Sequence, residues 1–203
     1  AEELSKVAVA SRQARFQERL ASAAEALDRG RFADARRMVQ PVLRDLPEMA
    51  FGHEIAGLSL YRLGQWRKAA AELETARLLD GTVNHHAVLA DCYRALHRYH
   101  EVEQLWRELR EASPAPALLA EGRIVAAGAL ADQGDLQGAL AIMSKALEVP
   151  KKPRDYHLRQ WYVLADLLDR SGDVIKARRY FGLVFEADRE FADVKERLRT
   201  LGR

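Results

Sequence analysis

The stretch Trp161–Asp188, WYVLADLLDRSGDVIKARRYFGLVFEAD, decides the fold. Its apolar residues recur every three or four positions on both sides of a central Ser-Gly-Asp sequence. This period is typical of amphipathic α-helices, and a glycine between two such segments supplies the open backbone that a tight helix–helix turn needs. The stretch therefore predicts two short helices joined by a turn at Gly172.

The same pattern recurs four times upstream, and its turn residue sets the register. In each copy the turn residue lies five positions before a residue of the second helix that is small, or Val in the most degenerate copy. These pairs are Gly30 and Ala35, Gly64 and Ala69, His97 and Val102, Gly134 and Ala139, and Gly172 and Ala177. Successive turn residues are 34, 33, 37 and 38 positions apart. A pair of short helices cannot bury its apolar faces alone, so the sequence predicts an all-helical array of five stacked pairs.

At these positions the chain resembles the tetratricopeptide repeat (TPR) family. The family motif has a large residue, Leu, a small residue and another large residue in the first helix, then a small residue and an aromatic residue in the second. The last copy matches with Trp161, Leu164, Ala165, Leu168, Ala177 and Phe181. Gly57 takes the small position in the second copy, and Ala146 ends the motif in the fourth. The segment 123–140, RIVAAGALADQGDLQGAL, is also similar to actinobacterial members. The resemblance implies an α-solenoid of stacked antiparallel helix pairs that follows a right-handed superhelix.

We expect residues 1–203 to form a single helical repeat domain. Its expected parts are an N-terminal helix at 2–15, repeats at about 16–49, 50–83, 83–116, 120–153 and 158–191, and a C-terminal capping helix at 191–201. The N-terminal segment either continues into the first repeat as one long helix or forms a separate helix. Pro41 lies inside the second helix of the first repeat, where it removes a helical hydrogen bond, so we expect a kink or break near Gln40.

Composition and charge argue against several classes of function. The formal net charge is +2 and no segment is strongly basic, which disfavours a nucleic-acid partner. No run of about 18 apolar residues is present, so we expect no membrane partner. The single cysteine, Cys92, allows no intramolecular disulfide and fits a reducing compartment. Arginine is far more frequent than lysine, which indicates a GC-rich bacterial genome. We therefore expect a cytoplasmic, bacterial protein.

No residue pattern indicates an enzyme or a metal site. The neighbours His85 and His86 would point about 100° apart on a helix, and His97 and His100 flank a turn. The sequence has neither a zinc-type cysteine spacing nor a glycine-rich phosphate loop. We expect Cys92 to pack as a small apolar group, because no base or oxyanion site can be placed beside it. The expectation is a protein without catalytic activity, metal or cofactor.

The resemblance also implies where a partner binds. In TPR proteins the first helices of the repeats line a concave face, and ligands usually lie there. The residues expected to line this groove are Glu54, Leu58, Tyr61, Arg62, Asp91, Arg94, Tyr162, Asp166 and Asp169. Tyrosine and arginine often anchor interfaces. We therefore expect a non-catalytic protein–protein interaction module that binds a peptide or helix of a partner protein. The alternative is a self-associating scaffold, a homo-oligomer built through a terminal helix or an end repeat.

Overall fold

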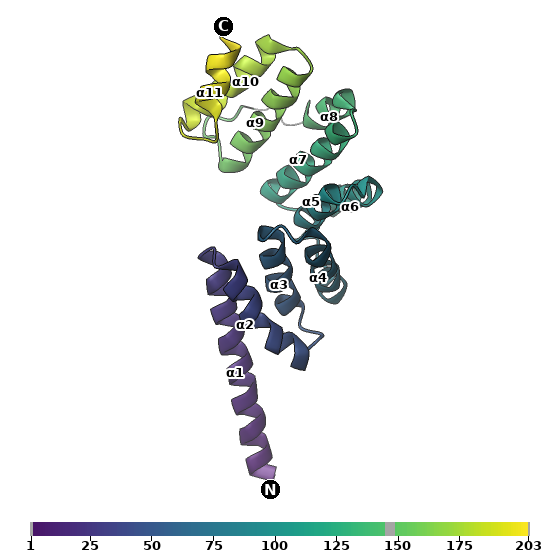
Figure 1. Ribbon diagram of the computed structural model, residues 1–203, viewed down its shortest axis with the longest axis vertical. Coiled ribbons are helices and arrows are strands. Elements are labelled where there is room, and N and C mark those ends of the chain that lie inside the picture. The colour runs from purple at the N-terminus through teal and green to yellow at the C-terminus, as the bar shows by residue number, and fades with distance from the viewer. Residues whose placement is uncertain (1, 145–148, 203) are drawn as a thin grey trace. The chain divides into compact units, whose positions relative to one another are not determined.

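The structure, a computed structural model, describes residues 2–144 and 149–202, with side chains from residue 11 onward (Figure 1). The described ranges contain helices and no strand, which confirms the all-α prediction. The eleven helices of the described residues are α1 Glu2–Asp28, α2 Phe32–Asp45, α3 Ala50–Arg62, α4 Trp66–Asp80, α5 His86–Ala95, α6 Tyr99–Ala112, α7 Pro116–Asp132, α8 Leu136–Met143, α9 Asp155–Arg170, α10 Val174–Ala187 and α11 Val194–Leu201. The predicted motif residue Ala146 lies outside the described residues.

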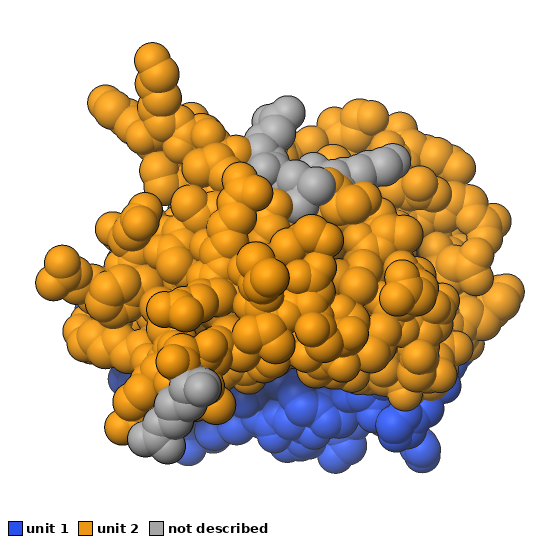
Figure 2. Space-filling view, turned by 90° about the horizontal axis from the view of Figure 1, so that it is seen from above, with its two compact units in different colours: residues 1–98 blue, residues 99–203 orange. Residues whose placement is uncertain are grey.

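The chain divides into two compact units, Ala1–Arg98 and Tyr99–Arg203, which Figure 2 shows in blue and orange. The boundary lies between α5 and α6 and therefore falls inside the third expected repeat. The single repeat domain stays a prediction, and the two units are described separately below.

The five expected turns have the open backbone that a tight helix–helix turn needs. The five turn residues have φ angles in the left-handed region: Gly30 74°, Gly64 70°, His97 58°, Gly134 85° and Gly172 88°. Glycine adopts this conformation without steric cost, whereas a histidine there is uncommon. The degenerate copy therefore keeps the backbone of the turn although it lacks the glycine.

Small side chains let the helices of unit 1 approach closely. Ala23, Ala26, Ala35 and Ala56 are almost wholly buried at the contacts among α1, α2 and α3. At the crossing of α3 and α4, a Cβ atom on Gly57 would lie 2.7 Å from the Cγ atom of a leucine on α4. The two backbones can approach this closely because glycine has no side chain at the crossing.

The first helix of the chain is continuous. α1 runs from Glu2 to Asp28 without interruption, so of the two expected alternatives the structure has the single long helix. Its antiparallel partner α2 ends at Asp45, whose side chain reaches back to Arg12 at 3.5 Å. α1 is 27 residues long and α2 only 14, so the N-terminal part of α1 runs past the end of α2 (Figure 1).

α2 does not break near Gln40, and the expected alternative of a kink there stays a prediction. α2 continues through Pro41 to Asp45, with Val39 and Val42 wholly buried on either side of the proline. Proline removes one backbone hydrogen bond and disfavours the helix locally. Burial of the flanking valines against α1 and α3 outweighs this cost, because each buried apolar side chain contributes about 1.5–3 kcal/mol.

The core of unit 2 is built on the stretch that sets the repeat pattern. Trp161, Ala165 and Phe181 are almost wholly buried between α9 and α10, as expected for packing residues. The capping helix α11 covers the end of this core with the buried Val194. Leu198 packs against the same cluster, which confirms the amphipathic character expected of this helix.

Candidate functional site

In unit 1 a row of polar side chains joins α3 to α5. The hydroxyl of Tyr61 donates a hydrogen bond to Oδ2 of Asp91 at 2.7 Å. The other carboxylate oxygen, Oδ1, accepts from Nη1 of Arg94 at 3.0 Å. All three side chains are half-buried, so they are both held in place and open to solvent on one side. The structure thus brings together three of the expected groove residues.

The environment of Tyr61 keeps its hydroxyl neutral. Burial raises the pKa of Tyr61 well above its ordinary value, and the hydrogen bond to the Asp91 carboxylate raises the pKa further. The tyrosine therefore remains a hydrogen-bond donor throughout the neutral range. The hydrogen bond from Tyr61 to Asp91 is therefore available throughout that range.

The remaining expected residues of unit 1 lie in different surroundings. Glu54 is 3.5 Å from the ring nitrogen Nε2 of His85, which lies just before α5. Leu58 is half-buried on α3. The guanidinium of Arg62 is 4.7 Å from the ring centroid of Phe32, the first residue of α2. Arg62 therefore packs toward α2, whereas Tyr61 reaches α5.

In unit 2 the expected residues on α9 contact the C-terminal segment of the chain. Nη2 of Arg197, on α11, lies 2.7 Å from Oδ1 of Asp166 and 3.2 Å from Oδ2 of Asp169. The hydroxyl of Tyr162 donates a hydrogen bond to Asp193, just before α11. Burial, followed by this hydrogen bond, raises the pKa of Tyr162 to about 12. The polar atoms of all three residues on α9 are thus engaged within the chain.

Sequence reasoning missed Arg197 and Asp193. Arg197 follows Val194 by three positions, and residues three apart lie on one face of a helix. That spacing places Arg197 on the same face as the residue expected to cover the core. The guanidinium also lies over the ring of Phe181, at 4.9 Å from its centroid. A cation on the covering face of the capping helix was the signal available in the sequence.

The described part of the chain holds no group of three or more His, Cys, Asp and Glu side chains that could hold a metal ion. Cys92 is wholly buried in α5, and this burial raises the pKa of its thiol to about 12. Near neutral pH the thiol therefore stays protonated, and the reactive thiolate is not formed. Within the described residues no helix is long and apolar enough to cross a bilayer.

Solved structures share this arrangement of helix pairs. A thermophilic TPR protein of Thermus thermophilus is 18% identical with a TM-score of 0.68 over 92% of this chain and 98% of its own. The pilF protein of Pseudomonas aeruginosa is 15% identical with a TM-score of 0.67 over 95% and 90%. The fold is the TPR fold. A TPR protein of Parabacteroides merdae, 16% identical, gives a TM-score of 0.68 over 95% of this chain and 80% of its own.

At these identities the likeness to the solved TPR structures is one of fold. No protein-family model matches the sequence, and no curated protein matches it. The TPR fold therefore rests on the architecture, the left-handed turns and the packing of the motif residues. What the surface of this chain binds has to be argued from its own side chains.

Proposed function

We propose that the protein is a non-catalytic protein–protein interaction module, which binds a peptide or helix of a partner on the face formed by the first helices of its repeats. The observation that supports this proposal is the half-buried row of Tyr61, Asp91 and Arg94 across α3 and α5. The row offers one aromatic ring, one anion and one cation within a few ångströms. Such a combination suits the recognition of a polypeptide that has both apolar and polar groups.

The geometry of the row favours binding because it is already ordered. Side chains that are held by hydrogen bonds before a partner arrives lose less conformational freedom on binding. In this proposal the ring of Tyr61 and the side chain of Leu58 provide apolar contact. Asp91 and Arg94 set the register of the partner through their charges.

The two units contribute differently to this proposed function. The expected residues of unit 2, Asp166 and Asp169, are already paired with Arg197. These pairs join α9 to the capping helix α11, so a partner that took them over would loosen that helix. The pairs of the row in unit 1 join first helices only, and a partner can add to them without detaching an element. We therefore assign the main binding surface to Glu54, Leu58, Tyr61, Asp91 and Arg94 of unit 1, with Arg62 at its edge.

Site-specific photo-crosslinking tests the proposed surface. Leu58 is replaced by benzoylphenylalanine, and the protein is irradiated in a lysate of the source cells. The matched control carries the same group at Leu78, which lies on α4 and is 77% exposed. We expect a discrete crosslinked partner with the probe at position 58 and none at position 78. Substituting Arg94→Ala in the first protein should reduce the yield several-fold.

Equal crosslinking at both positions would show unspecific contact and would contradict the groove proposal. The same holds if Arg94→Ala leaves the yield unchanged while circular dichroism shows an intact fold. The identity of the crosslinked protein follows from mass spectrometry of the adduct.

Self-association through a terminal helix is the second candidate function. It is favoured by α1, whose N-terminal part runs beyond the end of α2 and therefore lacks that neighbour. Light scattering over a wide range of protein concentrations tests it. A mass that rises with concentration supports a scaffold, and a constant monomer mass rules it out.

A further inference from the structure

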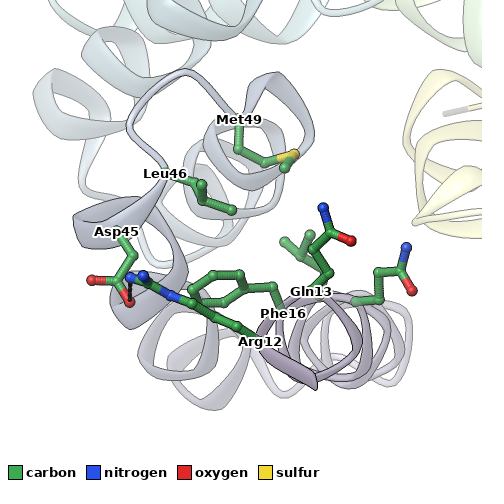
Figure 3. A pocket seen from close by; sticks show the side chains of 8 residues that line it. Arg12, Gln13, Phe16, Asp45, Leu46 and Met49 are labelled. Atoms are coloured by element: carbon green, nitrogen blue, oxygen red, sulfur yellow. Dashed lines mark ion pairs between the residues drawn. The ribbon is translucent and has the colours of Figure 1, made fainter. Parts of the chain in front are cut away.

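A pocket of about 600 Å³ opens between α1 and the segment that joins α2 to α3 (Figure 3). Its apolar lining consists of Phe16, Leu20, Leu46 and Met49. Its polar lining consists of Arg12, Gln13, Gln17 and Asp45. None of these residues belongs to the proposed binding surface on α3 and α5. The pocket is therefore a separate feature of unit 1.

The pocket follows from the unequal lengths of the first two helices. α2 ends at Asp45, and the chain then turns through Leu46 and Met49 into α3. The N-terminal part of α1 extends beyond this turn. The ring of Phe16 is therefore only half-buried, with one side open to the pocket (Figure 3). A pocket of this size with an apolar floor and a few polar groups at its edge is typical of a ligand site.

The charges around the pocket are unbalanced. Arg12 and Asp45 form an ion pair with an N–O distance of 3.5 Å, and their side chains are 60% and 48% exposed. A second hollow shares Arg12, Phe16 and Asp45 with the pocket and is also lined by Arg15 and Arg19. Within the described part of the chain, neither of these two arginines has a carboxylate partner. Their spacing places them with Arg12 along one edge of α1.

The nearest carboxylate in sequence, Glu18, follows Arg15 by three positions and directly precedes Arg19. Within the described residues it forms an ion pair with neither arginine. The pocket thus has a cationic edge of arginines on one side and the amides of Gln13 and Gln17 on the other. Arginine binds carboxylates through paired N–H donors, and side-chain amides pair with peptide groups.

We propose that this pocket docks an acidic segment of a partner protein, which places an apolar side chain on Phe16 and its carboxylates along Arg12, Arg15 and Arg19. The exposed pair with Asp45 contributes little to stability, so an incoming carboxylate displaces Asp45 from Arg12 at small cost. A second copy of the chain fits less well. A symmetric contact would place the same arginine edges against each other.

Fluorescence anisotropy with two labelled peptides tests the docking. The first is the acidic peptide EELFEELLEE, and the second is its lysine counterpart KKLFKKLLKK. We expect the wild-type protein to bind the acidic peptide and not the basic one, with an affinity that falls as salt is added. The double variant Arg15→Glu, Arg19→Glu should weaken this binding about tenfold or more.

Three further variants sharpen the test. Asp45→Asn frees Arg12 from its carboxylate and should tighten binding of the acidic peptide about twofold. Gln13→Trp places a bulky ring at the exposed mouth and should block binding without removing a core side chain. The control Arg67→Glu, Lys68→Glu makes the same change of charge on exposed positions of α4, which do not line the pocket. It should leave the affinity within about twofold.

The proposal is overturned if the lysine peptide binds as well as the acidic one, or if the control weakens binding as much as the pocket variants do. It is also overturned if the wild type is a dimer in sedimentation and Gln13→Trp makes it a monomer, because the occupant is then a second copy. Circular dichroism of each variant establishes that it is folded. Crosslinking from Leu58 does not depend on the pocket, so the two proposals fail separately.

Discussion

Gly57 sets how closely α3 and α4 approach each other. A Cβ atom at this position would lie 2.7 Å and 2.8 Å from Cγ and Cδ2 of Leu73, and 3.2 Å from its backbone nitrogen. The side-chain atoms of Leu73 have little room to move, because this residue is wholly buried. The backbone contact cannot be relieved without shifting one helix.

Gly57→Ala should therefore lower the free energy of unfolding by about 1–3 kcal/mol, since overpacking outweighs the gain in helix propensity. Urea unfolding followed by circular dichroism measures the change. The matched control is Gly182→Ala in α10, where an added Cβ atom meets nothing within 4 Å. This control should be neutral or stabilise by up to about 1 kcal/mol. Equal stabilisation by both substitutions would show that α3 and α4 do not approach each other this closely at Gly57.

Tyr162 gives the protein a pH-dependent stability in the alkaline range. Its pKa is raised from 10.0 to about 12, first by burial and then by the hydrogen bond to Asp193. Below pH 10 the phenol is neutral in both folded and unfolded chains, so its contribution is complete. Above pH 10 the unfolded chain loses this proton and the folded chain keeps it, so stability falls as the pH rises toward 12.

We expect the free energy of unfolding of Tyr162→Phe to fall less steeply between pH 10 and 12 than that of the wild type. A residual slope remains, because the pKa of Tyr61 and that of Tyr93 are raised as well. Urea unfolding at a series of pH values provides the measurement. Identical slopes for the two proteins would contradict the assignment.

At the scale of the element, α11 is held against the rest of unit 2 by one arginine as well as by its apolar face. Arg197 contacts Asp166 and Asp169, and its guanidinium lies over the ring of Phe181. Its side chain is only 25% exposed, so these interactions are less screened than those of a surface pair. Among the described residues Arg199, two positions further, pairs with Glu196 of the same helix and with no other carboxylate.

Arg197→Ala should lower the free energy of unfolding by about 1–2 kcal/mol, because it leaves two carboxylates without their common cation. The control Arg199→Ala removes an exposed pair and should change stability by less than about 0.5 kcal/mol. Thermal unfolding followed by circular dichroism distinguishes the two variants. Equal effects would show that α11 is held by its apolar face alone.

The elements themselves could be predicted from the sequence, because periodicity and turn residues are local signals. The turn at Gly172 and the burial of Trp161 and Phe181 follow from spacing alone. The ion pairs of Arg197 could not be predicted in the same way, since they join residues 28 and 31 positions apart. The continuity of α2 through Pro41 was also missed, because tertiary burial overrides a local propensity.

The candidate site was predictable to a smaller extent. Helical spacing placed Tyr61 and Asp91 on the first helices of neighbouring repeats, but not the hydrogen bond between them. The rotation of Arg62 toward Phe32 depends on how α3 packs on α2, which no pattern in either helix specifies. The pocket beside Phe16 arises from the difference in length between α1 and α2. Pro47 marks the end of α2 in the sequence, but the sequence left open whether α1 is one helix or two.

At the scale of the whole molecule, helix pairs that contact only their neighbours should respond locally to damage. Ala165 is wholly buried between α9 and α10, so Ala165→Leu adds volume where none is free. We expect a loss of about 1–3 kcal/mol in that region. Hydrogen exchange followed by mass spectrometry should show faster exchange in residues 155–187 and unchanged exchange in residues 50–80.

The control for this experiment is Ile175→Ala, which alters a side chain of α10 that is 85% exposed. It should leave exchange unchanged in both regions. Faster exchange throughout the chain after Ala165→Leu would mean that the two units unfold as one cooperative body.

The left-handed turns have a consequence for how such proteins evolve and are found. Four of the five turn residues are glycine and the fifth is His97, yet all five share a positive φ angle. A β-branched side chain is strongly disfavoured in that conformation, whereas substitutions at the helix positions need only preserve volume. A repeat can therefore drift away from its motif and still keep its period. A search that scores residues tolerant of this turn, at intervals of 33 to 38 positions, should detect relatives that motif searches overlook.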